Sequence, residues 1–224
     1  MEVTVGGMLP TPVIAYYSQV HHMIGVMITA SHNPYEDNGL KVFEFGFKVL
    51  ESSKKALETA MKKVISYEAK PVTYEITNIE HEYLEFVRKL YPNIKFNDYV
   101  IDDAHGATSK LSKTLFPVEH YFCEPNGKNI NESCGATHME SILTLKNTPV
   151  AFSFDGDGDR MLMVINDEII YGDQVLYVFA KDQKLHGHDV SVALSMMTNP
   201  GVIKSFESLN IDIFETPVGD AYLF

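Results

Sequence analysis

The sequence predicts an α/β protein with mixed, mostly parallel sheets and flanking helices. Three observations support this class. Short apolar, β-branched runs alternate with longer amphipathic stretches along the 224 residues. Hydrophobic residues make up 45% of the chain, which is enough to build packed cores and argues against disorder. The longest apolar runs, such as Val175–Ala180, are far shorter than the ~20 residues of a membrane-spanning helix, so no membrane partner is expected.

The first part of the chain is predicted to contain three strands and two helices. Thr11 and Pro12 are typical of a helix start, because Thr caps the first turn and Pro needs no backbone donor there. Gly25–Thr29 (GVMIT) has the composition of a buried strand. The expected elements are strand Val3–Val5, helix Thr11–Val20, strands Gly25–Thr29 and Leu40–Phe43, and helix Ser52–Ile65.

The same alternation continues after the polar segment Glu68–Asn78, which is the best candidate for an interdomain linker. A hairpin is expected across Asn166-Asp167. The predicted helices are Ile79–Tyr91, Ala107–Leu115, Met139–Leu145, Asp173–Lys181 and Gly201–Leu209. The predicted strands are Tyr99–Asp102, Val118–Phe122, Val150–Phe154, Met161–Ile165, Glu168–Tyr171, Val190–Leu194 and Ile211–Phe214.

Charge and cysteine content narrow the function classes. The formal net charge is −12, which disfavours a broad nucleic-acid-binding surface. The two cysteines, Cys123 and Cys134, form no disulfide framework, and the chain does not open with a secretory signal pattern. A reduced, cytoplasmic setting is therefore expected.

An acidic loop, Asp155-Gly-Asp-Gly-Asp159, directly follows a predicted strand. Three carboxylates at alternate positions can converge on one point, and their repulsion favours a bound hard cation such as Mg²⁺ or Ca²⁺. Arg160 adds a forked donor suited to a phosphate oxygen. A solvated acidic turn is the simpler alternative. An EF-hand is excluded, because its Gly and Glu positions hold Arg160 and Asn166.

A second loop, Thr29-Ala-Ser-His-Asn-Pro34, follows the strand Gly25–Thr29 and presents Ser31 at the end of that strand. Its composition is equally typical of an ordinary turn. His32 beside Ser31 does not constitute a catalytic triad, because sequence neighbours rarely face each other correctly. Lys41 follows the tight turn Asn38-Gly39, and taken alone it has the character of a solvated surface lysine.

Together these two loops resemble the α-D-phosphohexomutase superfamily, whose serine loop reads T-A-S-H-N-P, followed by N-G-x-K, and whose metal loop reads D-G-D-x-D-R. Gly7–Pro12 (GMLPTP) also resembles a segment of that superfamily. Glu124–His138 (EPNGKNINESCGATH) and Asp102–Ala107 (DDAHGA) are similar to segments of its phosphoglucosamine mutase branch, as are Leu194–Asn199 and Thr216–Tyr222.

The resemblance implies a division into a partial first domain (1–72), a second domain with the metal loop (73–171) and a partial third domain (172–224). It also implies one Mg²⁺ per site and phosphorylation of Ser31. The implied assignments are Ser31, Lys41 and His32 for catalysis, Arg160 and Asn33 for phosphate oxygens, and Ser31, Asp155, Asp157 and Asp159 for the metal.

The implied reaction interconverts glucosamine 6-phosphate and glucosamine 1-phosphate, toward a cell wall precursor, through a phosphoserine and a bisphosphate. Phosphomannomutase or phosphoglucomutase activity and a non-catalytic Mg²⁺-binding fragment remain the alternatives. The superfamily's sugar-contacting loop and distal phosphate clamp have no counterpart in this sequence, so weak activity or none is expected from this chain alone. Interrupted sheets are also expected to expose strand edges, which would favour a homo-oligomer.

Overall fold

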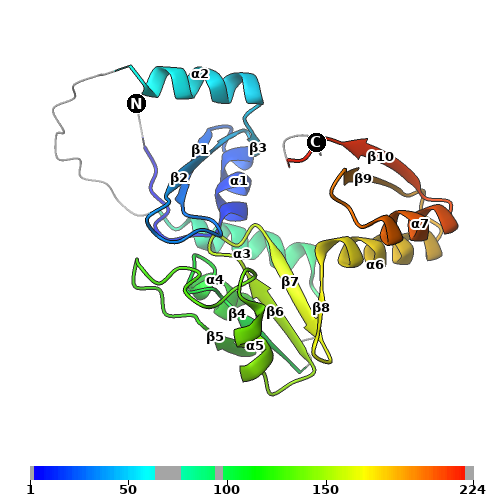
Figure 1. Cartoon of the computed structure of the whole chain (residues 1–224). Helices are drawn as coiled ribbons and strands as arrows, with labels where there is room; N and C mark the ends of the chain where they lie inside the picture. Colours follow the sequence, from blue (N-terminus) through cyan, green and yellow to red (C-terminus); the bar gives the residue numbers. More distant parts are fainter. Residues whose placement is uncertain (1–2, 64–76, 94–97, 220–224) are drawn as a thin grey trace. The chain divides into compact units, whose positions relative to one another are not determined.

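The computed structural model describes residues 3–63, 77–93 and 98–219 (Figure 1). The chain divides into two compact units, Met1–Asp167 and Glu168–Phe224. The expected linker Glu68–Asn78 lies outside the described residues except for its last two positions. Among the described helices, none combines the length and the apolar character needed to cross a bilayer.

The first unit begins with a small antiparallel sheet of order β1-β2-β3. Its elements are α1 (Thr11–Val20), β1 (Ile24–Thr29), β2 (Gly39–Glu44), β3 (Phe47–Lys48) and α2 (Glu51–Met61). β1 alternates between exposed and buried residues, and its buried Met27 packs against Ile14 of α1. Gly25 lies so close to the same helix that a Cβ there would be 3.1 Å from Ile14 and Ser18. The pairing of β1 with β2 makes the residues between them, 30–38, a loop at the end of both strands.

A larger sheet of order β5-β4-β6-β7-β8 follows in the chain. β4 (Tyr99–Asp102) is parallel to β5 (Glu119–Tyr121) and to β6 (Val150–Phe154), whereas β7 (Met161–Ile165) runs antiparallel to β6. The helices associated with it are α3 (Ile79–Leu90), α4 (Ser109–Leu115) and α5 (Met139–Leu145). The acidic loop therefore follows directly on β6, in the interior of the sheet.

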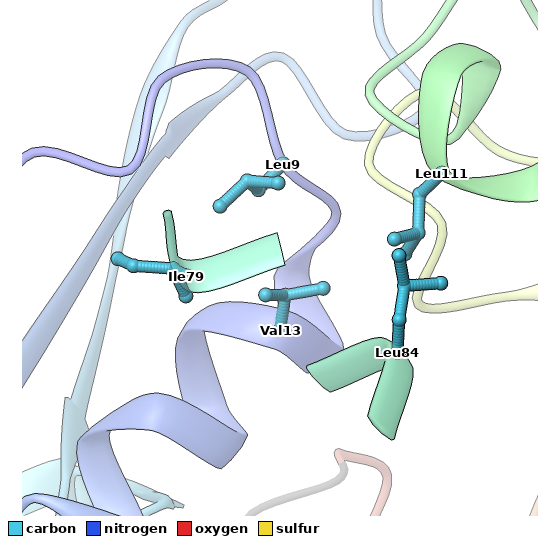
Figure 2. Close-up of a cluster of buried hydrophobic side chains, with 5 residues drawn as sticks. All are labelled: Leu9, Val13, Ile79, Leu84 and Leu111. Carbon is cyan, nitrogen blue, oxygen red and sulfur yellow. The ribbon is translucent and has the colours of Figure 1, made fainter. Parts of the chain in front are cut away.

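A hydrophobic cluster joins the two sheets' helices within the first unit. Figure 2 shows its five buried side chains: Leu9, Val13, Ile79, Leu84 and Leu111. They come from α1 and the segment before it, from α3 and from α4. Burial of such side chains contributes roughly 1.5–3 kcal/mol each. This packing holds the serine loop's sheet against the elements that carry the acidic loop.

The second unit is smaller and begins with β8 (Glu168–Ile170). It contains α6 (Gly172–Leu185), β9 (Ser191–Ser195), α7 (Pro200–Ser208) and β10 (Asp212–Thr216), and β9 and β10 are parallel. Asn199 caps α7, since its side-chain oxygen accepts a hydrogen bond from the Gly201 amide at 2.8 Å. The core of this unit consists of Ala180, Val192, Leu194, Phe206 and Ile211.

The expected α/β class is confirmed, with several local differences. Val3–Val5 forms only an isolated bridge at Val5 instead of a strand. β3 is not predicted by the sequence, and the first sheet is antiparallel because a short loop, not a crossover helix, joins β1 to β2. The turn at Asn166-Asp167 is present, and both residues have the positive φ that a tight hairpin requires.

Candidate active site

The serine loop holds Ser31 in an unusual backbone conformation. Its φ is +54°, in the left-handed region that non-glycine residues seldom occupy. The Ser31 amide donates a hydrogen bond to Thr29 Oγ1 at 2.8 Å, so the last residue of β1 fixes the first turn of the loop. Ser31 is half-buried, while the following residues through Asn38 are exposed.

The acidic loop is a tight turn between β6 and β7. The Gly158 amide donates to the Asp155 carbonyl at 3.0 Å, and Gly158 has a φ of +67°. This turn brings Asp155, Asp157 and Asp159 together, with one carboxylate oxygen of each lying within 4.8 Å of the others. Asp155 and Asp157 are fully buried, which raises the cost of leaving their charges unpaired.

The two loops meet at the Ser31 hydroxyl. Ser31 Oγ lies 3.4 Å from Asp155 Oδ2 and accepts a hydrogen bond from Arg160 Nη2 at 3.0 Å. Lys41, on β2, places its Nζ 3.3 Å from the same oxygen. A carboxylate and two cations therefore converge on the oxygen of one hydroxyl.

The other two expected site residues are placed differently. His32 lies at the edge of the site, where its Nδ1 accepts a hydrogen bond from Arg160 Nη2. Asn33 is exposed, and its backbone carbonyl accepts a hydrogen bond from Asn131 Nδ2 at 3.0 Å. The structure thus brings His32 to the site through Arg160, whereas the Asn33 side chain makes no hydrogen bond to the other site residues within the described part of the chain.

Lys41 and the aspartates neutralise one another. Its Nζ donates to Asp157 Oδ2 and to Asp159 Oδ2, both at 2.6 Å. Burial opposes the charged amine and is the largest single influence, but these two carboxylates together outweigh it and raise the pKa of Lys41. The pKa of Asp155 is raised by burial and by its two acidic neighbours, against the opposing effect of Arg160.

The acidic cluster fits a divalent cation. Its donors are hard carboxylate oxygens, which Mg²⁺ prefers. Asp157 Oδ1 is buried and has no hydrogen-bond partner among the residues that the structure describes, and such an acceptor is costly unless something binds it. Lys41 already places one positive charge between two of these carboxylates.

Sequence reasoning missed residues that hold the acidic loop in place. The Thr11 amide donates to the Asp157 carbonyl at 2.8 Å, and its hydroxyl donates to Asp157 Oδ2. The expectation that Thr11 caps α1 is wrong, because the N-cap is Pro10 and the Thr11 hydroxyl is engaged by Asp157. The Ala107 amide donates to the Gly156 carbonyl at 2.8 Å. Thr11 and Ala107 belong to the segments GMLPTP and DDAHGA. The family resemblance of these segments marks them as notable, but it does not predict that they bind the acidic loop.

Gly156 explains how the two loops can approach so closely. A Cβ at this position would lie 2.5 Å from the side chain of Ile130 and 2.5 Å from the Ser31 carbonyl oxygen. Any side chain larger than hydrogen would therefore push the acidic loop away from the serine loop. The glycines of the acidic loop serve this close packing as well as the turn.

Comparison with known proteins places the chain in a family. Residues 1–68 match the model of phosphoglucomutase/phosphomannomutase α/β/α domain I, and residues 171–224 match that of domain III. The chain belongs to the phosphoglucomutase/phosphomannomutase family. The family expected from the serine and acidic loops is thereby confirmed.

Relatives of this mutase family align with nearly the whole chain. Phosphoglucosamine mutase of Pseudomonas entomophila is 34% identical over 243 residues, covering 99% of this chain and 54% of its own length. Phosphoglucosamine mutase of Chlamydia pneumoniae is 36% identical over 247 residues, covering 100% of this chain and 53% of its own. The chain therefore spans about half the length of these curated relatives.

Solved structures of the mutase family share the fold. A protein assigned as a phosphomannomutase from Thermus thermophilus superposes with a TM-score of 0.82 at 22% identity, covering 97% of this chain and 54% of that one. A phosphoglucomutase/phosphomannomutase family protein from Burkholderia thailandensis gives a TM-score of 0.76 at 22% identity, covering 99% and 53%.

Proposed function

We propose that this chain carries the phosphoryl-transfer centre of a phosphoglucosamine mutase-type isomerase, with Ser31 as the phosphoryl carrier. The observation that carries the proposal is the convergence on Ser31 Oγ of Arg160 at 3.0 Å, Lys41 at 3.3 Å and Asp155 at 3.4 Å. A hydroxyl that carries a phosphoryl group needs positive charge on one side and a general acid or base within reach. This arrangement supplies both.

Each residue has a role that its position supports. Ser31 Oγ attacks the phosphorus and loses its proton, the bond from phosphorus to the sugar oxygen breaks, and the departing sugar oxygen takes up a proton. The Arg160 guanidinium, with His32 beside it, is placed to hold the oxygens of the transferring group. The exposed side chain of Asn33, two residues after Ser31, is proposed to bind an oxygen of the same group. Lys41 Nζ lies 3.3 Å from Ser31 Oγ, and this amine is proposed to exchange the proton of the sugar hydroxyl.

The carboxylates of Asp155, Asp157 and Asp159, with the oxygen of Ser31, would hold one Mg²⁺. When bound, the ion supplies neutralisation of the phosphoryl charge during transfer. The buried Asp157 Oδ1 offers it an otherwise unused ligand. Lys41 now provides the charge that balances this cluster, so binding of the ion would free the amine from two of its acceptors.

The proposed reaction interconverts glucosamine 6-phosphate and glucosamine 1-phosphate through the sugar bisphosphate. The amino sugar is favoured because the aligned relatives from Pseudomonas and Chlamydia are named phosphoglucosamine mutases. Expressed alone, these 224 residues should accept phosphate on Ser31 but isomerise the sugar at least about 100-fold more slowly than a full-length relative. The reason is that binding of the sugar's second phosphate, which fixes the reacting geometry, strongly affects the rate.

The first test is transfer of phosphate to Ser31. The chain is incubated with glucosamine 1,6-bisphosphate and Mg²⁺, and intact mass followed by peptide mapping locates the adduct. We expect one phosphate on Ser31, none on Ser31→Ala, and none when EDTA replaces Mg²⁺. A folded chain that stays unmodified would contradict the proposal and favour a non-catalytic, Mg²⁺-binding role.

A phosphomannomutase or phosphoglucomutase is the second candidate. The family model spans those two activities, and the superposed solved structures carry those names. The same assay with glucose and mannose bisphosphates discriminates between them. Faster labelling of Ser31 by either neutral sugar than by the amino sugar would favour this alternative.

A further inference from the structure

Asn131 makes a contact with the serine loop that the proposed chemistry does not use. Its Nδ2 donates to the Ser31 carbonyl at 2.8 Å and to the Asn33 carbonyl at 3.0 Å. Asn131 is 6% exposed and follows Ile130, whose side chain adjoins Gly156. One amide from residues 124–138 thus binds two carbonyls about 100 positions earlier in the chain.

The serine loop needs such support. Ser31 occupies the left-handed backbone region, which costs free energy for a residue with a Cβ and persists only where surrounding contacts impose it. Residues 32–38 are exposed and contribute little burial of their own. The Thr29 hydroxyl holds the Ser31 amide, and Asn131 holds its carbonyl, so both ends of the strained residue are tied.

Asn131 is itself fixed in place. Its amide donates to the Ala104 carbonyl at 2.9 Å, and its φ is +58°. Because Nδ2 faces two carbonyl oxygens, the opposite orientation of the side-chain amide would place an acceptor against two acceptors. Its Oδ1 has no hydrogen-bond partner within the described part of the chain. The side chain therefore serves as a double donor.

We propose that Asn131 is a positioning residue that holds Ser31 in its left-handed conformation and so aims Oγ at Arg160, Lys41 and the acidic loop. The proposal rests on the proposed function for its kinetic consequence, but the contact to the loop can be tested separately. It assigns a physical role to the second asparagine of the Asn129-Ile-Asn131 motif.

Three variants of the full chain test this role. Asn131→Asp is isosteric but turns one donor into an acceptor against two carbonyls, and Asn131→Ala removes the amide. Asn129→Ala is the matched control, because the Asn129 side chain bonds to the Asn126 amide and the Glu124 carbonyl of its own segment and, among the described residues, to no part of the serine loop. Hydrogen–deuterium exchange is followed for peptides covering residues 29–35 and 139–165, together with the rate of Ser31 phosphorylation.

Both Asn131 variants should exchange at least about 10-fold faster in residues 29–35, with residues 139–165 unchanged. Their phosphorylation rate should fall by roughly 10–100-fold, as expected for a misplaced nucleophile, whereas Asn129→Ala should resemble the parent in both measurements.

Unchanged exchange at residues 29–35 would overturn the proposal, as would faster exchange everywhere, which would indicate a general folding role. Faster local exchange with an unchanged phosphorylation rate would also overturn it. If the parent chain is never phosphorylated, the proposed function fails, and the exchange data alone still decide whether Asn131 holds the loop.

Discussion

Asp157 combines hydrogen bonds that hold its carboxylate in place with one carboxylate oxygen that is left open. Its Oδ2 accepts hydrogen bonds from Lys41 and from the Thr11 hydroxyl, and its backbone carbonyl accepts one from the Thr11 amide. Its Oδ1 is left without a partner in the described structure, although the residue is fully buried. The first set of contacts places the carboxylate, and the open oxygen remains for a ligand.

Replacing this carboxylate should weaken metal binding. Asp157→Asn removes one of three charged ligands, so we expect Mg²⁺ affinity to fall by at least about 10-fold. Isothermal titration of the parent, of Asp157→Asn and of the exposed control Asp212→Asn measures this directly. Equal affinities in all three proteins would show that the acidic cluster is not the cation site.

Several site residues could be predicted one by one, and others could not. Short motifs contain Ser31, Arg160 and the three aspartates, and the residue types in these motifs indicate phosphate and metal binding. Thr11 makes two hydrogen bonds to Asp157, 146 positions away, and the Asn131 side chain makes two to the serine loop, about 100 positions away. Such a contact leaves no local pattern, because it depends on how two distant loops pack.

At the scale of elements, the site is assembled from loops that follow strands. β1 ends at Thr29 just before Ser31, and β6 ends at Phe154 just before Asp155. β4 contributes its last residue, Asp102, which accepts hydrogen bonds from the Ala104 and Gly135 amides at 2.8 Å each. Asp102 thereby joins the segments that begin at Ala104 and Gly135 to the end of β4, the neighbour of β6.

Asp102 should make stability depend on pH. Burial raises the pKa of this carboxyl from 3.8 to about 6, despite the hydrogen bonds that lower it. The unfolded chain therefore releases this proton first as pH rises, so the residue's contribution to stability declines between about pH 4 and 6. The full loss is on the order of 3 kcal/mol, and it is complete above about pH 6.

Urea unfolding at pH 4 and pH 7 tests this effect. The stability of the parent relative to Asp102→Asn should decrease at the higher pH, because only the parent has a carboxyl at position 102 that ionises. Asn also alters the hydrogen bonds that Asp102 accepts, which shifts the stability of the variant at every pH. The informative quantity is therefore how the difference in unfolding free energy between parent and variant changes from pH 4 to pH 7. Parallel pH profiles for the two proteins would contradict the raised pKa.

The whole molecule consists of two units with separate hydrophobic cores. The proposed site lies entirely in the first unit, between residues 29 and 160. In that unit β1 has one neighbouring strand, β2, in the described sheet, and its outward face exposes Ile24, Val26 and Ile28. A free strand edge beside apolar side chains is prone to pair with another chain.

The isolated chain should therefore self-associate through β1. Light scattering after size-exclusion chromatography should give a mass above one chain at tens of micromolar, and Ile28→Lys, at a position 69% exposed, should shift it toward the monomer. Leu185→Lys is the control, because Leu185 is similarly exposed on α6 of the other unit. A monomeric parent at every concentration would refute this expectation.

The sequence by itself determined the α/β class, the family and the two loops, because these depend on local periodicity and on residue types that recur in short motifs. Tertiary structure alone decided that the loops meet within hydrogen-bonding distance, that Lys41 lies between two aspartates, and that the Asn131 side chain donates to two carbonyls of the serine loop. The physical reason is the range of the interactions. Strand and turn preferences act over a few neighbouring residues, whereas the packing of α1, α3 and α4 that brings Ser31 to the acidic loop joins segments remote in sequence.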